Sequence, residues 1–333
     1  MRKIILAGVA LVMIFMLGFG AAAYYCTYRV KVSANSPDNK SNEKEIIYVK
    51  DEKKTNKKEE DIEDEILLYK NRNKDKVEDG KNEPPSVTPK DDFAPLTVDV
   101  STLSTEKKSW YFNPKKNGVP SGAPEEIKVL IKKYRGYYLG NIEDKTIYLT
   151  FDEGYENGYT GKILDVLREN NVKAAFFVTT TYINDNKELI KRMTDEGHMV
   201  CNHSTTHRSM DTIKDEESFN RELLECEKNF EKVTGIKMPK YFRPPMGEYS
   251  ELSLYYTQKL KYKTIFWSFA YGDYEPDSQP APEYAKALIM ERTHGGGIYL
   301  LHAISKTNIE ILDWLIKEWK DKGFQFKSLY EIQ

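Results

Sequence analysis

The sequence predicts an α/β protein in which repeated β/α units form a parallel barrel, preceded by a long polar segment. From Lys145 onward, apolar strand-like runs alternate with amphipathic helical segments, which is the pattern of parallel β/α folds. The number of these units fits a barrel better than an open sheet. In such barrels, chemically active residues lie at the carboxyl ends of the strands.

Composition limits the classes of function. The chain has 333 residues, of which 40% are hydrophobic, which is enough for a substantial core. Its mean hydropathy of -0.64 therefore requires a long polar stretch elsewhere. The formal net charge of -2 gives no reason to expect nucleic-acid binding. Three cysteines without a CxxC motif do not make a disulfide framework.

The first 30 residues are predicted to be a transmembrane anchor. Arg2 and Lys3 precede an apolar stretch over residues 4–26, and about 20 apolar residues suffice to cross a bilayer as a helix. This positive flank predicts a single-pass protein with a cytoplasmic N-terminus and an extracytoplasmic remainder. A cleaved signal peptide is the alternative, because residues 21–23 resemble a cleavage site. The apolar stretch is longer than the usual core of a signal peptide, which favours the anchor.

Residues 31–92 are predicted to be a disordered charged linker. Lysine, glutamate, aspartate and asparagine dominate there, so the segment cannot bury enough apolar surface to offset the entropy of ordering. Aromatic residues return at Phe93, and residues 93–144 are predicted to form an irregular N-terminal part of the catalytic region. That part includes a helix near residues 124–134. Residues 145–333 then form the barrel domain.

The barrel domain is predicted to consist of alternating strands and helices. The predicted strands span residues 145–151, 172–178, 198–201, 241–244, 262–269 and 297–302. The predicted helices span residues 160–170, 186–196, 214–233, 251–260, 282–293 and 307–321.

Carboxylate, imidazole or guanidinium groups lie at the ends of five of these strands. In chain order they are Asp152 and Glu153, His203 and His207, Arg243, Asp273, and His302. Parallel strands end on one rim, so these side chains are expected to meet there.

The spacing of His203 and His207 predicts a metal site. Residues four apart in one turn or a tight loop bring two imidazoles to the same side, and a carboxylate with an open position for water completes a catalytic zinc site. Glu153 or Asp152 can supply that carboxylate, and the other acid then remains free as a base. Zinc is the first expectation, while manganese, cobalt and magnesium also suit an open mixed site.

The remaining groups complete a hydrolytic site. Arg243 is expected to hold the free carboxylate ionised and oriented. His302 is expected to be protonated and to donate to a leaving group, with Asp273 supporting its charged form. Together these groups predict metal-assisted hydrolysis of an amide or ester without a covalent nucleophile.

Five ordered motifs carry a family resemblance. "TFDEGY", "HSTTH", "RPPMG", "WSFAYGDY" and "LLH" resemble those of the NodB-homology polysaccharide deacetylases, carbohydrate esterase family 4. The resemblance runs from about Lys145 to the C-terminus. It implies a distorted (β/α) barrel that removes N- or O-acetyl groups from sugars.

The resemblance also implies the role of each matched residue near the metal. Asp152 matches the general base, and His203 and His207 match the histidine metal ligands. Glu153 stands where the family usually has a metal-binding aspartate, and its side chain is one methylene longer.

Further matches concern the rest of the catalytic machinery. Arg243 matches the arginine that orients the base, and the backbone N–H of Met246 matches the oxyanion donor. Asp273 and His302 match the aspartate–acid pair. Ala270 departs from the pattern, because many members carry an aspartate there.

Within the family, "TFDEGYENGYT" looks like the sporulation enzymes that deacetylate N-acetylmuramic acid. The likeness implies action on peptidoglycan whose stem peptides a partner amidase has removed, leading to muramic-δ-lactam in the spore cortex, on the forespore side. Deacetylation of N-acetylglucosamine in peptidoglycan or an exopolysaccharide is the alternative within the family. The alternatives from other functional classes are a non-catalytic glycan-binding protein that kept the barrel after losing the metal, and a membrane-tethered scaffold.

Aromatic residues flank the motifs, and aromatic faces commonly pack on sugar rings. Tyr155, Trp267 and Tyr249 are the expected substrate contacts, with Trp267 a candidate for the wall of the acetyl pocket.

Overall fold

A computed structural model describes residues 11–13, 22–31, 47–56 and 98–332 of the chain. The chain divides into two compact units, Met1–Ser86 and Val87–Gln333.

The first unit contains an antiparallel sheet of β1 (Leu11–Met13), β2 (Ala22–Lys31) and β3 (Ile47–Asn56). These strands differ from the helix predicted over residues 4–26 and from the linker predicted over residues 31–92. Strand β2 contains three tyrosines, one threonine and one valine, and such residues favour strands. The remainder of both predictions lies outside the described residues. No helix in the described part of the chain is long and apolar enough to span a bilayer.

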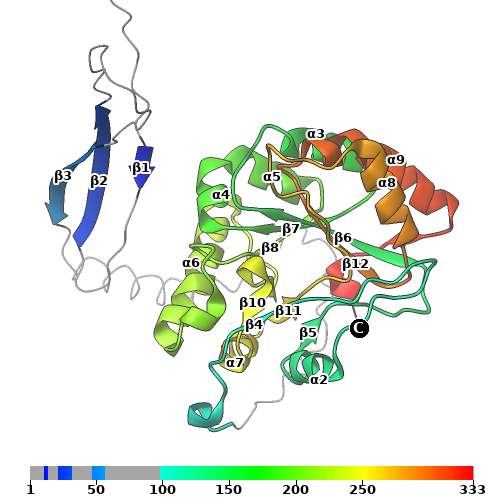
Figure 1. The fold of residues 1–333 in the computed structure, drawn as a ribbon, viewed down its shortest axis with the longest axis horizontal. Helices are drawn as coiled ribbons and strands as arrows, with labels where there is room; N and C mark the ends of the chain where they lie inside the picture. Colours follow the sequence, from blue (N-terminus) through cyan, green and yellow to red (C-terminus); the bar gives the residue numbers. More distant parts are fainter. Residues whose placement is uncertain (1–10, 14–21, 32–46, 57–97, 333) are drawn as a thin grey trace, which may run out of the picture. The chain divides into compact units, whose positions relative to one another are not determined.

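The second unit is built on a curled parallel sheet (Figure 1). The strand order is β12-β6-β7-β8-β9-β11-β5, and β13 pairs with β6. The bounds are β5 Gly136–Tyr137, β6 Thr146–Glu153, β7 Ala175–Val178, β8 Met199–Asn202, β9 Tyr241–Phe242, β11 Lys263–Ile265, β12 Gly297–His302 and β13 Gln325–Phe326. Single bridges join Leu139 to Gly297 and Phe269 to Tyr299, so residues that follow β5 and β11 meet β12. The sheet therefore curls into a distorted barrel, as expected.

Helices surround this sheet (Figure 1). Neighbouring helices touch in the order α8, α9, α3, α5, α6 and α7, which makes a ring of helices around the barrel. The bounds are α2 Glu125–Lys133, α3 Thr160–Glu169, α4 Thr180–Asp185, α5 Lys187–Asp195, α6 Glu216–Thr234, α7 Glu251–Lys259, α8 Pro282–Glu291 and α9 Lys306–Asp321. Each strand and helix predicted for residues 145–333 is present; the strand at 297–302 has the predicted bounds and the others have shifted ends, whereas α4, β10 (Glu248–Tyr249) and β13 were not predicted.

The segment before β6 packs onto the barrel. A two-stranded antiparallel sheet joins β4 (Lys108–Ser109) to β10 (Glu248–Tyr249). Trp110 stacks on Phe266 with ring centroids 4.7 Å apart, and its Nε1 donates to the carbonyl of Trp267 at 3.0 Å. This segment therefore supports one wall of the barrel mouth.

Candidate active site

Strand β6 sorts its side chains onto two faces. Its residues are all buried. Thr150 and Asp152 both contact Arg243 inside the curled sheet. Phe151 lies on the opposite face, in the hydrophobic core. Because consecutive side chains of a strand point to opposite faces, Asp152 and Glu153 do not share one face.

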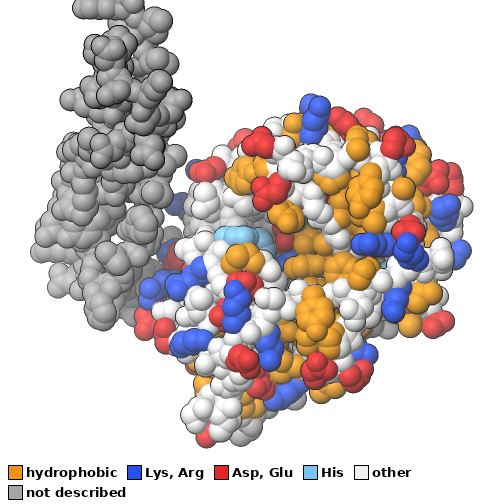
Figure 2. Space-filling view, in the orientation of Figure 1, with side chains coloured by type: hydrophobic (Ala, Val, Ile, Leu, Met, Phe, Trp, Pro, Cys, Tyr) orange, Lys and Arg blue, Asp and Glu red, His pale blue; other side chains and the backbone are white. Residues whose placement is uncertain are grey.

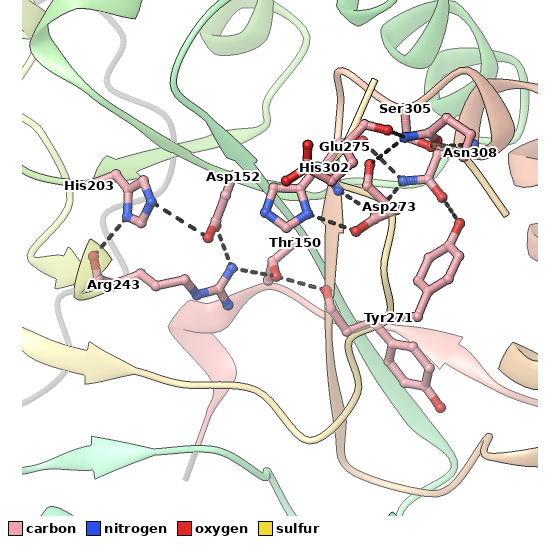
Figure 3. Close-up of polar contacts among 12 residues, drawn as sticks. Thr150, Asp152, His203, Arg243, Tyr271, Asp273, Glu275, His302, Ser305 and Asn308 are labelled. Atoms are coloured by element: carbon pink, nitrogen blue, oxygen red, sulfur yellow. Dashed lines mark hydrogen bonds and ion pairs between the residues drawn. The ribbon is translucent and has the colours of Figure 1, made fainter. Parts of the chain in front are cut away.

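A buried guanidinium holds Asp152 in its ionised form (Figure 3). Nη1 of Arg243 donates to Oδ1 of Asp152 at 2.7 Å, and Nε donates to the carbonyl of Ile265 at 3.1 Å. The guanidinium also lies over the ring of Phe177, 4.2 Å from its centroid. Burial raises the pKa of Asp152, but the charge of Arg243 helps to outweigh burial, and the pKa falls below its ordinary value. The structure thus brings the expected base and its arginine together.

Glu153 faces the helices and not the cavity. Oγ1 of Thr160 in α3 donates to its Oε1 at 3.4 Å, while Oε2 has no partner among the described residues. Burial, followed by the charge of Glu156, raises the pKa of Glu153 well above its ordinary value. The structure therefore does not bring Glu153 to the two histidines, because the pleat of β6 turns it toward α3.

His203 and His207 lie together at the carboxyl end of β8. Their ring centroids are 4.9 Å apart. Nδ1 of His203 donates to the carbonyl of Arg243 at 2.8 Å, which leaves Nε2 facing Asp152, 3.6 Å from its Oδ2. Burial lowers the pKa of His203 to about 4 and also lowers the pKa of His207. Both imidazoles are therefore neutral at neutral pH and suited to bind a metal.

The loop between the two histidines depends on helix α6. Ser204 and His207 have positive φ values of 69° and 54°, which are uncommon outside glycine. Oε2 of Glu222 accepts hydrogen bonds from the backbone N–H groups of Thr205 and Thr206 at 3.1 and 2.9 Å. Sequence reasoning missed Glu222, because the H-x3-H spacing does not indicate which residue of a later helix supports the loop.

His302 and Asp273 form a second polar pair (Figure 3). Nδ1 of His302 donates to Oδ1 of Asp273 at 2.8 Å. Burial lowers the pKa of His302, but the carboxylates of Asp273 and Asp152 together outweigh burial and the pKa rises above its ordinary value. Nδ2 of Asn308 donates to Oδ2 of Asp273 at 2.6 Å. Asn308 belongs to α9 and carried no signal in the motifs.

Asp152, His203, His207 and His302 line one cavity of about 750 Å³, whereas Arg243 and Asp273 do not line it. Asp152 and His302 are register partners in neighbouring strands β6 and β12. Figure 2 shows an apolar surface beside the exposed histidine edge. The other lining residues include aromatic, threonine and aliphatic side chains, among them Tyr155, Thr179, Thr181, Thr205, Thr206, Met246, Trp267, Ala270, Tyr271, Tyr274, Leu300 and Ile304. No lysine or arginine is among the described residues that line the cavity.

The expected substrate contacts divide into two groups. Tyr155 and Trp267 line the cavity, and Tyr155 is 51% exposed. Tyr249 does not line it, because its ring is fully buried against Phe266, with centroids 5.1 Å apart. Tyr274 lies edge-on to His302 at 5.9 Å and adds an exposed ring at the rim.

Met246 lies in the cavity wall, in the turn Pro245–Gly247. Its φ of 57° is in the left-handed region, and the φ of Gly247 is 66°. A Cβ on Gly247 would lie 2.8 Å from the ring of Trp267, so this position requires glycine. Met246 thus lies beside the cavity in a strained turn, and its N–H as the oxyanion donor stays a prediction.

The donor chemistry fits a divalent metal. Two neutral imidazoles beside an ionised carboxylate are ligands that zinc accepts. The nearest carboxylate is Asp152, the alternative that the sequence left open beside Glu153. His203 and His207 would hold the ion, with Asp152 as the adjacent carboxylate. In the part of the chain that the structure describes, no group of three His, Cys, Asp or Glu side chains stands at metal-binding spacing.

Fold and site together define a β/α-barrel hydrolase with a carboxylate and an imidazole beside one cavity. The polysaccharide deacetylase family profile matches residues 140–265. The peptidoglycan-N-acetylmuramic acid deacetylase PdaA of Bacillus subtilis (strain 168) is 43% identical over 233 residues, which cover 70% of this chain and 88% of PdaA. The solved structure of PdaA, a family 4 carbohydrate esterase, aligns with a TM-score of 0.67 at 42% identity, covering 69% of this chain and 98% of that one.

Two further relatives agree. A family 4 carbohydrate esterase from Bacillus anthracis aligns with a TM-score of 0.58 at 41% identity, covering 69% of this chain and 97% of that one. A peptidoglycan-N-acetylglucosamine deacetylase of Bacillus cereus is 26% identical over 260 residues, which cover 71% of this chain and 93% of that protein. The chain belongs to the polysaccharide deacetylase family, carbohydrate esterase family 4.

Proposed function

We propose that this protein removes the N-acetyl group of N-acetylmuramic acid in peptidoglycan that has lost its stem peptides. The observation that carries the proposal is the placement of Asp152, whose pKa is lowered by Arg243, and His302, whose pKa is raised by Asp273, in neighbouring strands beside one cavity. The likeness to PdaA supports muramic acid as the sugar. The freed amine lies near the lactyl carboxylate of the same sugar, and this proximity favours closure to muramic-δ-lactam.

The side chains divide the reaction into two proton transfers. Asp152 accepts a proton from water as the water oxygen adds to the acetyl carbon. His302 donates its proton to the amide nitrogen as the C–N bond breaks, so acetate and the free amine leave. The N–H of Met246 donates to the acyl oxygen, on which negative charge develops.

His203 and His207 would hold a divalent metal beside Asp152. Zinc suits this donor set best, and manganese, cobalt or magnesium also suit it. When bound, the metal supplies Lewis acidity to water and to the acyl oxygen. Arg243 keeps Asp152 ionised, and its carbonyl fixes the ring of His203.

Acetate release from stripped glycan tests the proposal. The zinc-loaded protein is incubated with amidase-treated peptidoglycan, and mass spectrometry identifies the deacetylated sugar. We expect muramic residues without acetyl groups, and loss of the reaction in Asp152→Asn and His302→Gln. Glu225→Gln, an exposed change on α6, is the matched control and should retain activity. A folded, zinc-loaded wild type that releases no acetate would overturn the proposal.

Deacetylation of N-acetylglucosamine is the second candidate, favoured by the Bacillus cereus relative. The same mass spectra separate the two, because the product is then glucosamine and no δ-lactam can form. An inactive glycan-binding protein would instead retain the stripped glycan without releasing acetate.

We also propose a setting for the reaction. The protein is anchored through residues 1–30 and acts outside the cytoplasm, on the forespore side of the wall, after a partner amidase. The positive flank of the apolar N-terminus supports this orientation. Spores lacking the protein should lack muramic-δ-lactam in their muropeptide profile, and an unchanged profile would contradict this setting.

A further inference from the structure

We propose that Asn308 is a positioning residue for the acid His302 and acts through Asp273. This inference rests on the proposed hydrolytic function, because it assigns a support to the acid of that reaction. Asn308 is 1% exposed, belongs to α9 and does not line the cavity.

Both carboxylate oxygens of Asp273 are occupied by donors. Oδ1 accepts from Nδ1 of His302, and Oδ2 accepts from the backbone N–H of His302, each at 2.8 Å. Nδ2 of Asn308 adds a third donor, at 2.6 Å from Oδ2. Asp273 is fully buried, so these donors replace the water that would otherwise solvate its charge.

The neighbours of Asn308 fix the orientation of its amide (Figure 3). The hydroxyl of Tyr271 donates to Oδ1 of Asn308. Nδ2 donates to the carbonyl of His302 at 3.0 Å as well as to Asp273. The backbone N–H of Asn308 donates to Oγ of Ser305, the N-cap of α9, at 3.0 Å. A flipped amide would place Oδ1 against two acceptors, so one orientation is selected.

This fixed amide determines where His302 points. Because Asp273 is held at Oδ2, its Oδ1 is aligned with Nδ1 of His302. The other ring nitrogen, Nε2, is then available to the substrate in the cavity. Without the amide donor, Oδ2 keeps only the backbone N–H of His302, so the Asp273 carboxylate is held less firmly and the imidazole moves with it. A small misplacement of a catalytic group costs about 100-fold in rate.

Asn170 offers a matched control. Its Nδ2 also donates to an aspartate, Asp313, at 2.9 Å, and to the carbonyl of Val166 at 2.9 Å. It connects α3 to α9 and does not line the cavity. Asn170→Ala therefore removes the same kind of amide contact without touching the acid pair.

The test separates positioning from folding. We expect Asn308→Ala and the isosteric Asn308→Asp to lower kcat by about 10-fold to 100-fold and to change KM by less than about twofold. The low-field proton NMR signal of the His302 Nδ1–H, which reports its bond to Asp273, should weaken or move upfield. Tyr271→Phe should shift that signal in the same direction by less. Asn170→Ala should leave both kcat and the signal unchanged.

Unchanged kcat, or an unchanged His302 signal, in folded Asn308→Asp would overturn the proposal. If Asn308→Ala fails to fold, Asn308→Asp and Tyr271→Phe carry the same comparison. If the wild type releases no acetate, the proposed function fails, whereas the NMR comparison still decides whether Asn308 positions His302.

Discussion

At the scale of single residues, Asp152 and Arg243 depend on each other. Arg243 has no exposed surface, and Asp152 is its carboxylate partner at 2.7 Å. Removing one partner of a buried pair leaves the other charge without compensation, which costs about 3–5 kcal/mol. The proposed base is therefore also part of what holds the barrel mouth together.

We expect Asp152→Asn to lose both rate and stability. Loss of the base should lower kcat by about 10²-fold to 10⁴-fold. The uncompensated charge of Arg243 should lower the free energy of unfolding by about 3–5 kcal/mol. Acetate release and thermal denaturation measure the two effects. A variant with the stability of the wild type would show that the pair is not a structural link.

The pH dependence should follow from the two shifted groups. Asp152 must be deprotonated to act, and its lowered pKa moves the acid limb of kcat/KM below the ordinary aspartate range, about pH 4. His302 must be protonated to act, and its raised pKa moves the alkaline limb above the ordinary histidine value, about pH 6.5. Initial rates across the pH range check this. An alkaline limb centred below pH 6 would contradict the assigned acid.

Glu153 should tolerate loss of its charge. Burial raises the pKa of Glu153 and so favours its neutral, protonated carboxyl, which glutamine matches in shape and charge. We expect Glu153→Gln to keep kcat and zinc content, whereas Glu153→Ala should lower the free energy of unfolding by about 1–3 kcal/mol. Elemental analysis and denaturation test this. Zinc loss in Glu153→Gln would return Glu153 to the ligand set that the sequence suggested.

At the scale of elements, α6 supports the loop that carries both histidines. Oε1 of Glu222 accepts from the hydroxyl of Thr206 at 2.7 Å, in addition to the two backbone bonds. We expect Glu222→Ala to weaken zinc binding by about 10-fold or more, because the loop is no longer held in its strained form. Glu222→Gln keeps an acceptor and should lose less.

Isothermal titration with Zn²⁺ measures this effect on the Glu222 variants. Glu225→Gln lies on the same helix with an exposed side chain and serves as the control. Equal zinc affinity in Glu222→Ala and the control would show that the loop holds its shape without α6.

The sequence was informative where local pattern decides the structure. The run predicted as residues 145–151 is β6, and its end continues through both acids to Glu153. Asp152, His203 and His302 were predicted to lie at one rim because they follow the ends of parallel strands, and all three line one cavity. The pleat of β6 continues beyond the apolar run and determines the face on which Glu153 lies. The polar character of Glu153 alone did not predict that face.

Other parts of the structure depend on distant partners. β5 has two residues, Gly136–Tyr137, and exists through parallel pairing with β11. Tyr249 is buried because Phe266 packs against it, and no motif encodes that contact. Such pairings were not predictable from periodicity, because they join segments far apart in the chain.

At the scale of the whole molecule, the barrel begins earlier in the chain than the alternation of predicted strands and helices, which starts at residue 145. Residues 93–144 were expected to be irregular, yet the described part supplies β5 and the packing of Trp110. The family profile also begins at residue 140, before the predicted domain boundary at residue 145.

The cavity wall offers aromatic rings and threonine hydroxyls, with neither lysine nor arginine among its described residues. A carboxylate-bearing polymer thus meets no fixed cationic wall to steer it in from a distance, and its capture relies on short-range contact. We expect KM to vary less than about twofold as ionic strength rises from about 0.05 M to about 0.5 M, although the Debye length falls markedly over that range. Initial rates on stripped glycan at graded salt check this. A steep dependence would mean that basic residues outside the cavity guide the strand to the site.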